Sequence, residues 1–137
     1  MPSEIFVDTQ FVIVLANRRD SHHDEAQELA RVYLTRQLVT TDAVLLEIGN
    51  GLARGLRQQA ATLIEGFRQT EGVEVVNLTP ALFDRAFELY INRPDKEWGL
   101  VDCLSFVVME DRAITDSLTY DRHFIQAGFV ALMRIES

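Results

Sequence analysis

The chain has 137 residues, 47% of them hydrophobic, and carries a formal net charge of −8. This length suits one domain with its own core, so we expect a single domain over residues 1–137. The acidic balance argues against nucleic-acid binding through a basic face. A group of acids that holds divalent cations can still bind nucleic acid, because it presents positive charge once the cations are bound. The single cysteine, Cys103, excludes an internal disulfide framework and a cysteine-based zinc cluster.

Apolar runs in this chain are short, the longest covering 11–16 and 106–109, which is far below the length that spans a bilayer. The opening residues MPSEIFVD contain an acid and lead directly into a strand pattern, which does not fit a secretory signal. We therefore expect a cytoplasmic protein with no membrane segment.

Strand and helix patterns alternate along the chain. The first half predicts a strand at 4–7, a helix at about 10–17, a helix from Asp20 to about Arg36, a strand at 38–41, a helix with Val44, Leu45, Ile48 and Leu52 on its apolar face, and a helix at about 58–69. The second half predicts a strand at 73–77, a helix that Thr79 caps and Pro80 opens, a turn at 92–99, an apolar helix at 100–110, and strands at 113–118 and 129–132. Strands separated by helices predict an α/β fold with a mostly parallel sheet covered on both faces.

Acidic residues follow three of the predicted strands. Asp8 comes directly after the first strand, Glu47 lies one turn into the helix after the second, and Asp121 follows the strand at 113–118. Taken singly, each has an ordinary explanation as a helix cap, a surface glutamate or a turn residue. Together they indicate a functional site, because the ligand-binding and catalytic residues of parallel sheets lie beyond the carboxyl ends of the strands.

Asp102 is a more informative acid. It is the only charged residue in LVDCLSFVVM, residues 100–109, a predicted helix that is apolar nearly all round. A buried carboxylate costs several kcal/mol unless it is paired or coordinated, although the positive end of the helix dipole offsets part of that cost. A structural cap or ion pair is the alternative to a functional role.

Four bare carboxylates at one edge of a sheet would repel one another, and hard divalent cations would resolve that repulsion. Mg²⁺ or Mn²⁺ fits a carboxylate shell better than zinc does, and His22, His23 and His123 lack zinc-protease spacing. Two such ions suit phosphodiester hydrolysis, because one lowers the pKa of an attacking water and the other stabilises the leaving oxygen. The residues leave open whether one ion or two are held.

Four segments stand out in order: FVDTQ with the following DSHHDEA, then TTDAVLLEIGNGLAR, WGLVDCLSFVVM and LTYDRHFIQAGF. They resemble the PIN domain family, in the group of VapC-type toxins and their stand-alone relatives, and the likeness runs from Ile5 to about Leu132. The resemblance implies a three-layer α/β/α sandwich around a mostly parallel sheet of four to five strands. It also implies Mg²⁺- or Mn²⁺-dependent cleavage of single-stranded RNA.

The resemblance also assigns roles by position. It implies that the catalytic, metal-binding acids are Asp8, Glu47, Asp102 and Asp121, and that the supporting polar residues are Thr9, Asn50 and Thr119. Asp116 is a further candidate, with an edge or salt-bridged position as its alternative. Two residues depart from the family pattern: Gln10 stands where Ser or Asn is frequent, and Gly99 where Ser or Thr commonly starts the helix of Asp102. Both would alter hydrogen bonding around the metal.

We expect a basic rim that holds the RNA backbone, formed by Arg54, Arg93, Lys96 and Arg122. Many members of the family form homodimers and are held inactive by a small antitoxin. Among rival functions, a phosphorelay receiver would need a lysine near the last strand, but Lys96 lies in another segment. A phosphatase that forms an aspartyl-phosphate would need an acid where Gln10 stands. A catalytically silent domain that binds RNA or protein remains an alternative.

Overall fold

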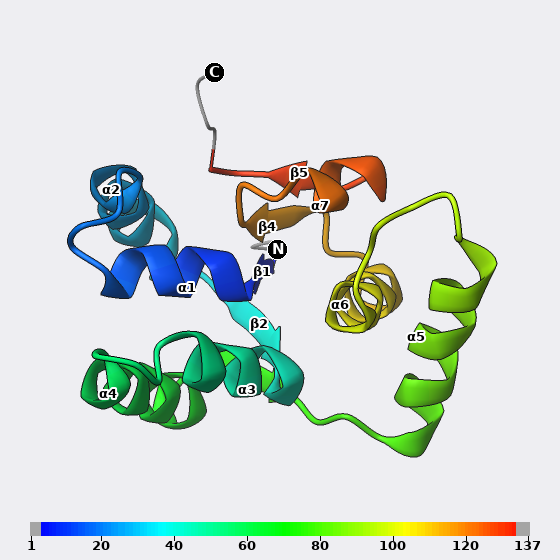
Figure 1. The fold of residues 1–137 in the computed structure, drawn as a ribbon, viewed down its shortest axis with the longest axis horizontal. Helices are drawn as coiled ribbons and strands as arrows, with labels where there is room; N and C mark the ends of the chain where they lie inside the picture. The colour runs from blue at the N-terminus through cyan, green and yellow to red at the C-terminus, as the bar shows by residue number, and fades with distance from the viewer. Residues whose placement is uncertain (1–3, 134–137) are drawn as a thin grey trace.

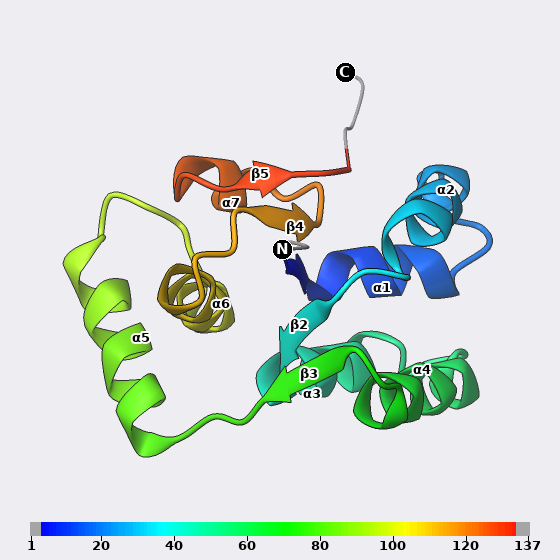
Figure 2. The same ribbon diagram turned by 180° about the vertical axis from the view of Figure 1, so that it is seen from behind.

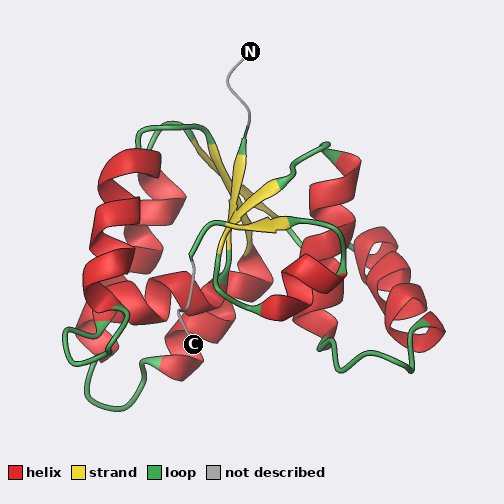
Figure 3. Ribbon diagram, turned by 90° about the horizontal axis from the view of Figure 1, so that it is seen from above, coloured by secondary structure: helices red, strands yellow, loops and turns green. Residues whose placement is uncertain are grey.

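The computed structural model describes residues 4–133, in which five strands form one parallel sheet in the order β3-β2-β1-β4-β5. The strands are β1 (Ile5–Val7), β2 (Leu38–Thr41), β3 (Val73–Val76), β4 (Asp116–Leu118) and β5 (Val130–Ala131). The helices are α1 (Thr9–Ala16), α2 (His23–Tyr33), α3 (Asp42–Gly51), α4 (Arg57–Gln69), α5 (Pro80–Asn92), α6 (Leu100–Asp111) and α7 (Arg122–Gln126). Helices flank the sheet on both sides (Figure 3), which confirms the predicted three-layer α/β/α fold. Residues 1–3 and 134–137 of the predicted domain lie outside the described residues.

The order of the strands explains where a site can form. The chain moves from β1 to β2 to β3 in one direction, with α1 to α4 on one side, and then returns past β1 to β4 through α5 and α6 on the other side (Figures 1 and 2). Right-handed crossovers require this change of side when the direction reverses. The carboxyl ends of β1 and β4 therefore flank the point of reversal, where open α/β sheets form their ligand crevices.

The middle of α6 is buried on all sides, which explains its continuous apolar sequence. Residues 103–109 are all buried, because α6 lies between the sheet and α5. Phe106 packs edge-to-face against both Trp98 and Phe124, with ring centroids 5.0 Å apart in each pair. This packing holds α6, whose first turn carries Asp102, against α7 and the residue Trp98 of the loop before α6. No helix in the described part of the chain is long and apolar enough to cross a membrane.

The helix predicted to begin at Asp20 is shorter than expected, since α2 runs only from His23 to Tyr33. The carboxylate of Asp20 accepts a hydrogen bond from the backbone N–H of His22 at 2.9 Å, which stabilises a turn ahead of the helix. Asp20 therefore does not cap α2.

The C-terminal part of the sheet also differs from the prediction. The strand predicted at 113–118 starts only at Asp116, because Ala113 adopts a φ of 55° and turns the chain away from α6. The sequence did not predict α7, a single short turn of helix. Asp121 caps it by accepting a hydrogen bond from the backbone N–H of His123 at 2.9 Å.

Candidate active site

A cleft of about 300 Å³ opens beyond the carboxyl ends of β1 and β4. We call it the acidic cleft, and its lining residues are Asp8, Thr9, Gln10, Ile13, Val14, Asp20, Glu47, Asp102, Tyr120 and Asp121. It contains all four acids that the sequence singled out, although they come from four separate segments. The strand order brings these segments to one edge of the sheet.

Asp8 is the most buried acid of the cleft, with only 5% of its surface exposed. Thr119 Oγ1 donates a hydrogen bond of 2.9 Å to Asp8 Oδ2. Burial raises the pKa of Asp8 to about 7, the hydrogen bond from Thr119 opposes that change, and the charges on Asp102 and Asp121 raise the pKa further. A carboxylate in this position is costly to ionise without a cation, and a bound cation would restore its charged form.

Asp102, Asp121 and His123 form the second part of the site. His123 Nδ1 lies 3.1 Å from Asp102 Oδ2 and 3.5 Å from Asp121 Oδ1. One potential ligand atom from each of the three residues lies within 4.8 Å of the others, a spacing that can hold a metal ion. Burial raises the pKa of Asp102, the hydrogen bond with His123 lowers it, and the charge on Asp121 raises it again.

Glu47 reaches the cleft from the exposed side of α3. That helix begins directly after β2, where Thr41 caps it by accepting a hydrogen bond from the backbone N–H of Val44 at 3.1 Å. Thr9 Oγ1 donates a hydrogen bond of 2.7 Å to Glu47 Oε1, which fixes the carboxylate above the start of α1. Thr9 and Thr119 thus each contact one of the acids.

Two of the predicted supporting residues lie apart from these acids. Asn50 is exposed, nearly one turn beyond Glu47 on α3, and is not among the residues that line the cleft. Asp116 is the first residue of β4 and so stands at the amino end of the strand, whereas the cleft lies at the carboxyl end. Its Oδ1 accepts a weak hydrogen bond of 3.5 Å from Thr115 Oγ1.

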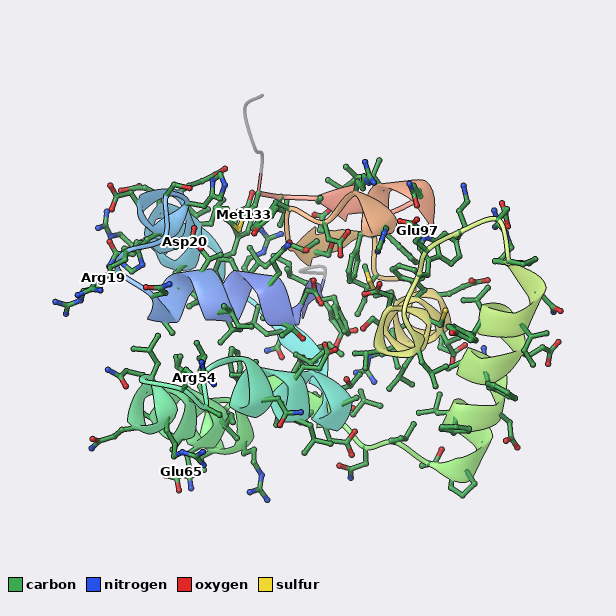
Figure 4. All side chains as sticks on the ribbon, viewed as in Figure 1. Arg19, Asp20, Arg54, Glu65, Glu97 and Met133 are labelled. Carbon is green, nitrogen blue, oxygen red and sulfur yellow. The ribbon has the colours of Figure 1, made fainter. Side chains whose placement is uncertain are left out.

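The predicted basic residues, all within the described part of the chain, do not line the cleft. Arg122 directly follows Asp121 and is exposed, whereas Lys96 lies in the loop before α6. In that loop Arg93 donates two hydrogen bonds of 3.0 Å to Asp95, and its guanidinium lies 5.1 Å from the centre of the Trp98 ring. Arg54 lies in the turn between α3 and α4, below α1 in the view of Figure 4.

Sequence reasoning gave no role in the site to Asp20, Tyr120 and His123, and saw Gln10 only as a departure from a pattern. Asp20 reaches the cleft because the turn after α1 folds back between α1 and α2 (Figure 4). Tyr120 and His123 flank Asp121 in the chain, so their proximity to it was the available signal. Asp20 carried no such signal, because it lies twelve positions after Asp8, on the far side of a helix.

The side chains of the cleft fit a hard divalent cation. Carboxylate oxygens dominate the set, one imidazole adjoins it, and the lone cysteine of the chain is buried in α6. Mg²⁺ and Mn²⁺ prefer such oxygen ligands, and Mn²⁺ also accepts an imidazole.

The chain is similar in sequence and fold to known proteins. The chain is 32% identical over 128 residues to the 23S rRNA-specific endonuclease VapC20 of Mycobacterium tuberculosis, covering 92% of this chain and 95% of the relative. The crystal structure of that protein, described as a sarcin–ricin loop cleaving toxin, superposes with a TM-score of 0.85 and 31% identity over 93% of this chain and 98% of the other. FitAcB from Neisseria gonorrhoeae shares the fold, with a TM-score of 0.62 and 15% identity over 93% and 95% of the two chains. The PIN domain model matches residues 5–130, and the chain therefore belongs to the PIN domain family.

Proposed function

We propose that this protein is a metal-dependent endoribonuclease whose active site is the acidic cleft. The observation that carries the proposal is the convergence of Asp8, Glu47, Asp102 and Asp121 at the point of strand reversal. With Asp8 buried and its pKa raised to about 7, this arrangement is costly for the folded protein unless a cation is present. Buried acids with a strongly raised pKa, which destabilise the folded protein, are common in active sites.

The cation is Mg²⁺ or Mn²⁺, held by Asp8, Asp102 and Asp121, with Glu47 completing the site directly or through water. When bound, such an ion promotes loss of a proton from water and offsets the charge that develops on the phosphate. The other residues orient the acids: Thr119 holds Asp8, and Thr9 holds Glu47. His123 Nδ1 lies 3.1 Å from Asp102 Oδ2 and 3.5 Å from Asp121 Oδ1, and its imidazole adds a nitrogen ligand to this set of acids.

The substrate class that we propose is a loop of large-subunit ribosomal RNA. The support is the 32% identity to a 23S rRNA-specific endonuclease over 92% of this chain, together with the shared fold. A loop meets the requirement for accessible, unpaired nucleotides, which can reach a recessed cleft more easily than a duplex can. Lys96, Arg54 and Arg122 would approach the RNA backbone outside the cleft, and Arg93 would do so only by leaving Asp95.

We further propose that the protein is a toxin that acts in the cytoplasm, where ribosomal RNA is available, and that a small protein antitoxin restrains it. A homodimer would form through α5, which exposes the aromatic residues Phe83, Phe87 and Tyr90 at 42%, 44% and 47%. The three rings lie in one row along the helix, with centroids 6.0 and 6.5 Å apart. A row of exposed aromatic side chains is typical of a protein interface.

The proposed activity is tested with labelled RNA that contains the sarcin–ricin loop, beside an unrelated single-stranded RNA. Wild-type protein is compared with Asp102→Asn and with the matched control Asp116→Asn, in Mn²⁺, Mg²⁺ or EDTA. Asp116 suits as a control because it lies at the opposite end of β4. We expect cleavage that requires metal, survives in Asp116→Asn and vanishes in Asp102→Asn.

Two results would contradict this function. Cleavage that persists in EDTA, or in folded Asp102→Asn protein, would place the chemistry elsewhere. RNA binding by the metal-loaded wild-type protein without any cleavage would favour the alternative, a catalytically silent domain that binds RNA or protein.

A further inference from the structure

Gln10 lies in the first turn of α1 with its side-chain amide fixed in one orientation. Its Oε1 accepts a hydrogen bond of 3.3 Å from the backbone N–H of Tyr120 and lies 3.2 Å from Thr119 Oγ1, whose single hydrogen is donated to Asp8. A backbone N–H can only donate, so the atom that faces Tyr120 must be the amide oxygen. The NH₂ group of Gln10 therefore points away from the loop after β4.

The two N–H donors of that NH₂ group are available to a ligand. Within the described residues, the side chain of Gln10 makes its contacts only through Oε1. No buried side-chain nitrogen or oxygen in that part of the chain lacks a partner. The Nε2 atom, which has no partner among residues 4–133, is therefore not buried, and Gln10 lines the acidic cleft.

The donors are unusual in a cleft whose other polar side chains are chiefly acceptors. Asp20, Glu47 and the three other acids offer only oxygens when ionised, and the hydroxyls of Thr9 and Thr119 are already donated to carboxylates. A phosphodiester that enters the cleft carries only acceptors on its phosphate. An uncharged amide that donates to it gives a favourable contact without adding charge near the metal site.

The same geometry decides which part of RNA Gln10 can contact. A glutamine that reads an adenine edge uses its oxygen and its nitrogen together. Here the oxygen is turned toward the backbone N–H of Tyr120, so the amide presents only its NH₂ donors to a ligand in the cleft. We propose that Gln10 is a substrate-binding residue whose Nε2 donates a hydrogen bond to a non-bridging oxygen of an RNA phosphate. The inference rests on the proposed ribonuclease function and names a backbone contact within that site.

Three variants test this assignment in the full-length protein. Gln10→Met keeps the length of the side chain and removes both donor and acceptor. Gln10→Glu keeps the oxygen that accepts from Tyr120 and replaces the donors with a second oxygen. Gln69→Met, on the exposed end of α4, is the matched control. For each, RNA affinity in Ca²⁺, KM and kcat in Mn²⁺, and Mn²⁺ affinity by calorimetry are measured.

We expect RNA affinity to fall about tenfold to a hundredfold in Gln10→Met, the range for a lost hydrogen bond to a charged acceptor. Gln10→Glu should bind RNA at least as weakly, since a carboxylate replaces the donors. KM should rise more than kcat falls, and Mn²⁺ affinity and the control should change by less than about twofold. The dependence of binding on salt should be unchanged in Gln10→Met, because a neutral donor releases no counterions.

Modified RNA identifies the atom that is contacted. A single phosphorothioate at the contacted phosphate should weaken binding to the wild-type protein and have no further effect on Gln10→Met. A 2′-deoxy substitution should weaken both proteins equally. Coupling to the 2′-deoxy position instead would overturn the phosphate assignment.

Other results separate the failure of this inference from the failure of the proposed function. If the wild-type protein cleaves RNA and Gln10→Met binds it equally well, the contact does not exist. If RNA and Mn²⁺ affinities fall together, Gln10 acts only through Thr119 and Asp8, and the inference is wrong. If the wild-type protein neither binds nor cleaves RNA, the proposed function is wrong, and the proposed contact between Gln10 and RNA is excluded with it.

Discussion

Thr119 and Asp8 are joined by a hydrogen bond of 2.9 Å although 111 positions separate them in the chain. The same Thr119 Oγ1 accepts a hydrogen bond of 3.0 Å from the backbone N–H of Asp121. One buried hydroxyl therefore connects the acid after β1 with the loop after β4. This connection joins the two segments that flank the point where the strand order reverses.

Replacing Thr119 with Val should loosen the metal site. The change removes the donor to Asp8 and the acceptor for Asp121 while keeping the shape of the side chain. We expect Mn²⁺ affinity to fall about tenfold to a hundredfold, the usual effect of losing a partner of a metal ligand. The free energy of unfolding should fall by about 1–3 kcal/mol. Calorimetry and urea unfolding measure both, with Thr62→Val on exposed α4 as the control, and an unchanged Mn²⁺ affinity would contradict this role.

Asp8→Asn should stabilise the metal-free protein at high pH. The folded protein holds the pKa of Asp8 at about 7, above the ordinary value of 3.8. Between these values the folded chain keeps a proton that the unfolded chain has released, so stability falls as pH rises from 4 to 7 and stays low above. Asn avoids this cost, which amounts to as much as about 4 kcal/mol at pH 8.

Thermal unfolding in EDTA at pH 4 and pH 8 measures this difference. The variant should match the wild-type protein at pH 4 and exceed it at pH 8, whereas added Mn²⁺ should stabilise the wild-type protein far more than the variant. Equal stability of the two proteins at pH 8 in EDTA would show that the ionised carboxylate of Asp8 does not destabilise the folded protein.

His123→Ala should change the preference between metals. The imidazole lies within reach of Asp102 and Asp121, and nitrogen ligands favour Mn²⁺ over Mg²⁺. We expect the variant to lose more affinity for Mn²⁺ than for Mg²⁺. His22→Ala serves as the control, since His22 packs against the Tyr120 ring but does not belong to the cluster. Equal losses for the two metals would mean that His123 only orients the carboxylates.

Phe87→Glu should convert the proposed dimer into a monomer. A charge in the middle of the aromatic row on α5 would be desolvated without a partner in the interface. Light scattering after gel filtration measures the mass, and Val32→Glu on exposed α2 is the control. A wild-type protein that is already monomeric, or a variant that stays dimeric, would exclude α5 as the interface.

The sequence by itself determined most of the fold. Strand and helix patterns fixed the alternation of elements, because buried parallel strands and two-faced helices have distinct periodicities. Thr79 and Pro80 marked the start of α5 correctly, since capping is a local effect of a few residues. Asp102 stood out for a similar reason, as the lone charge in an apolar helix.

Tertiary structure decided which side chains enter the cleft, which the sequence pattern did not predict. Asp20 enters the cleft only because the turn after α1 folds back toward β1, and Asp116 is excluded only because it stands at the wrong end of β4. The orientation of Gln10 depends on Tyr120, 110 positions away in the chain. Local propensities indicate where a chain turns and which face it buries, but hydrogen bonds between distant segments depend on the order of strands in the sheet. That order is set by packing of the whole chain, and so no single segment encodes it.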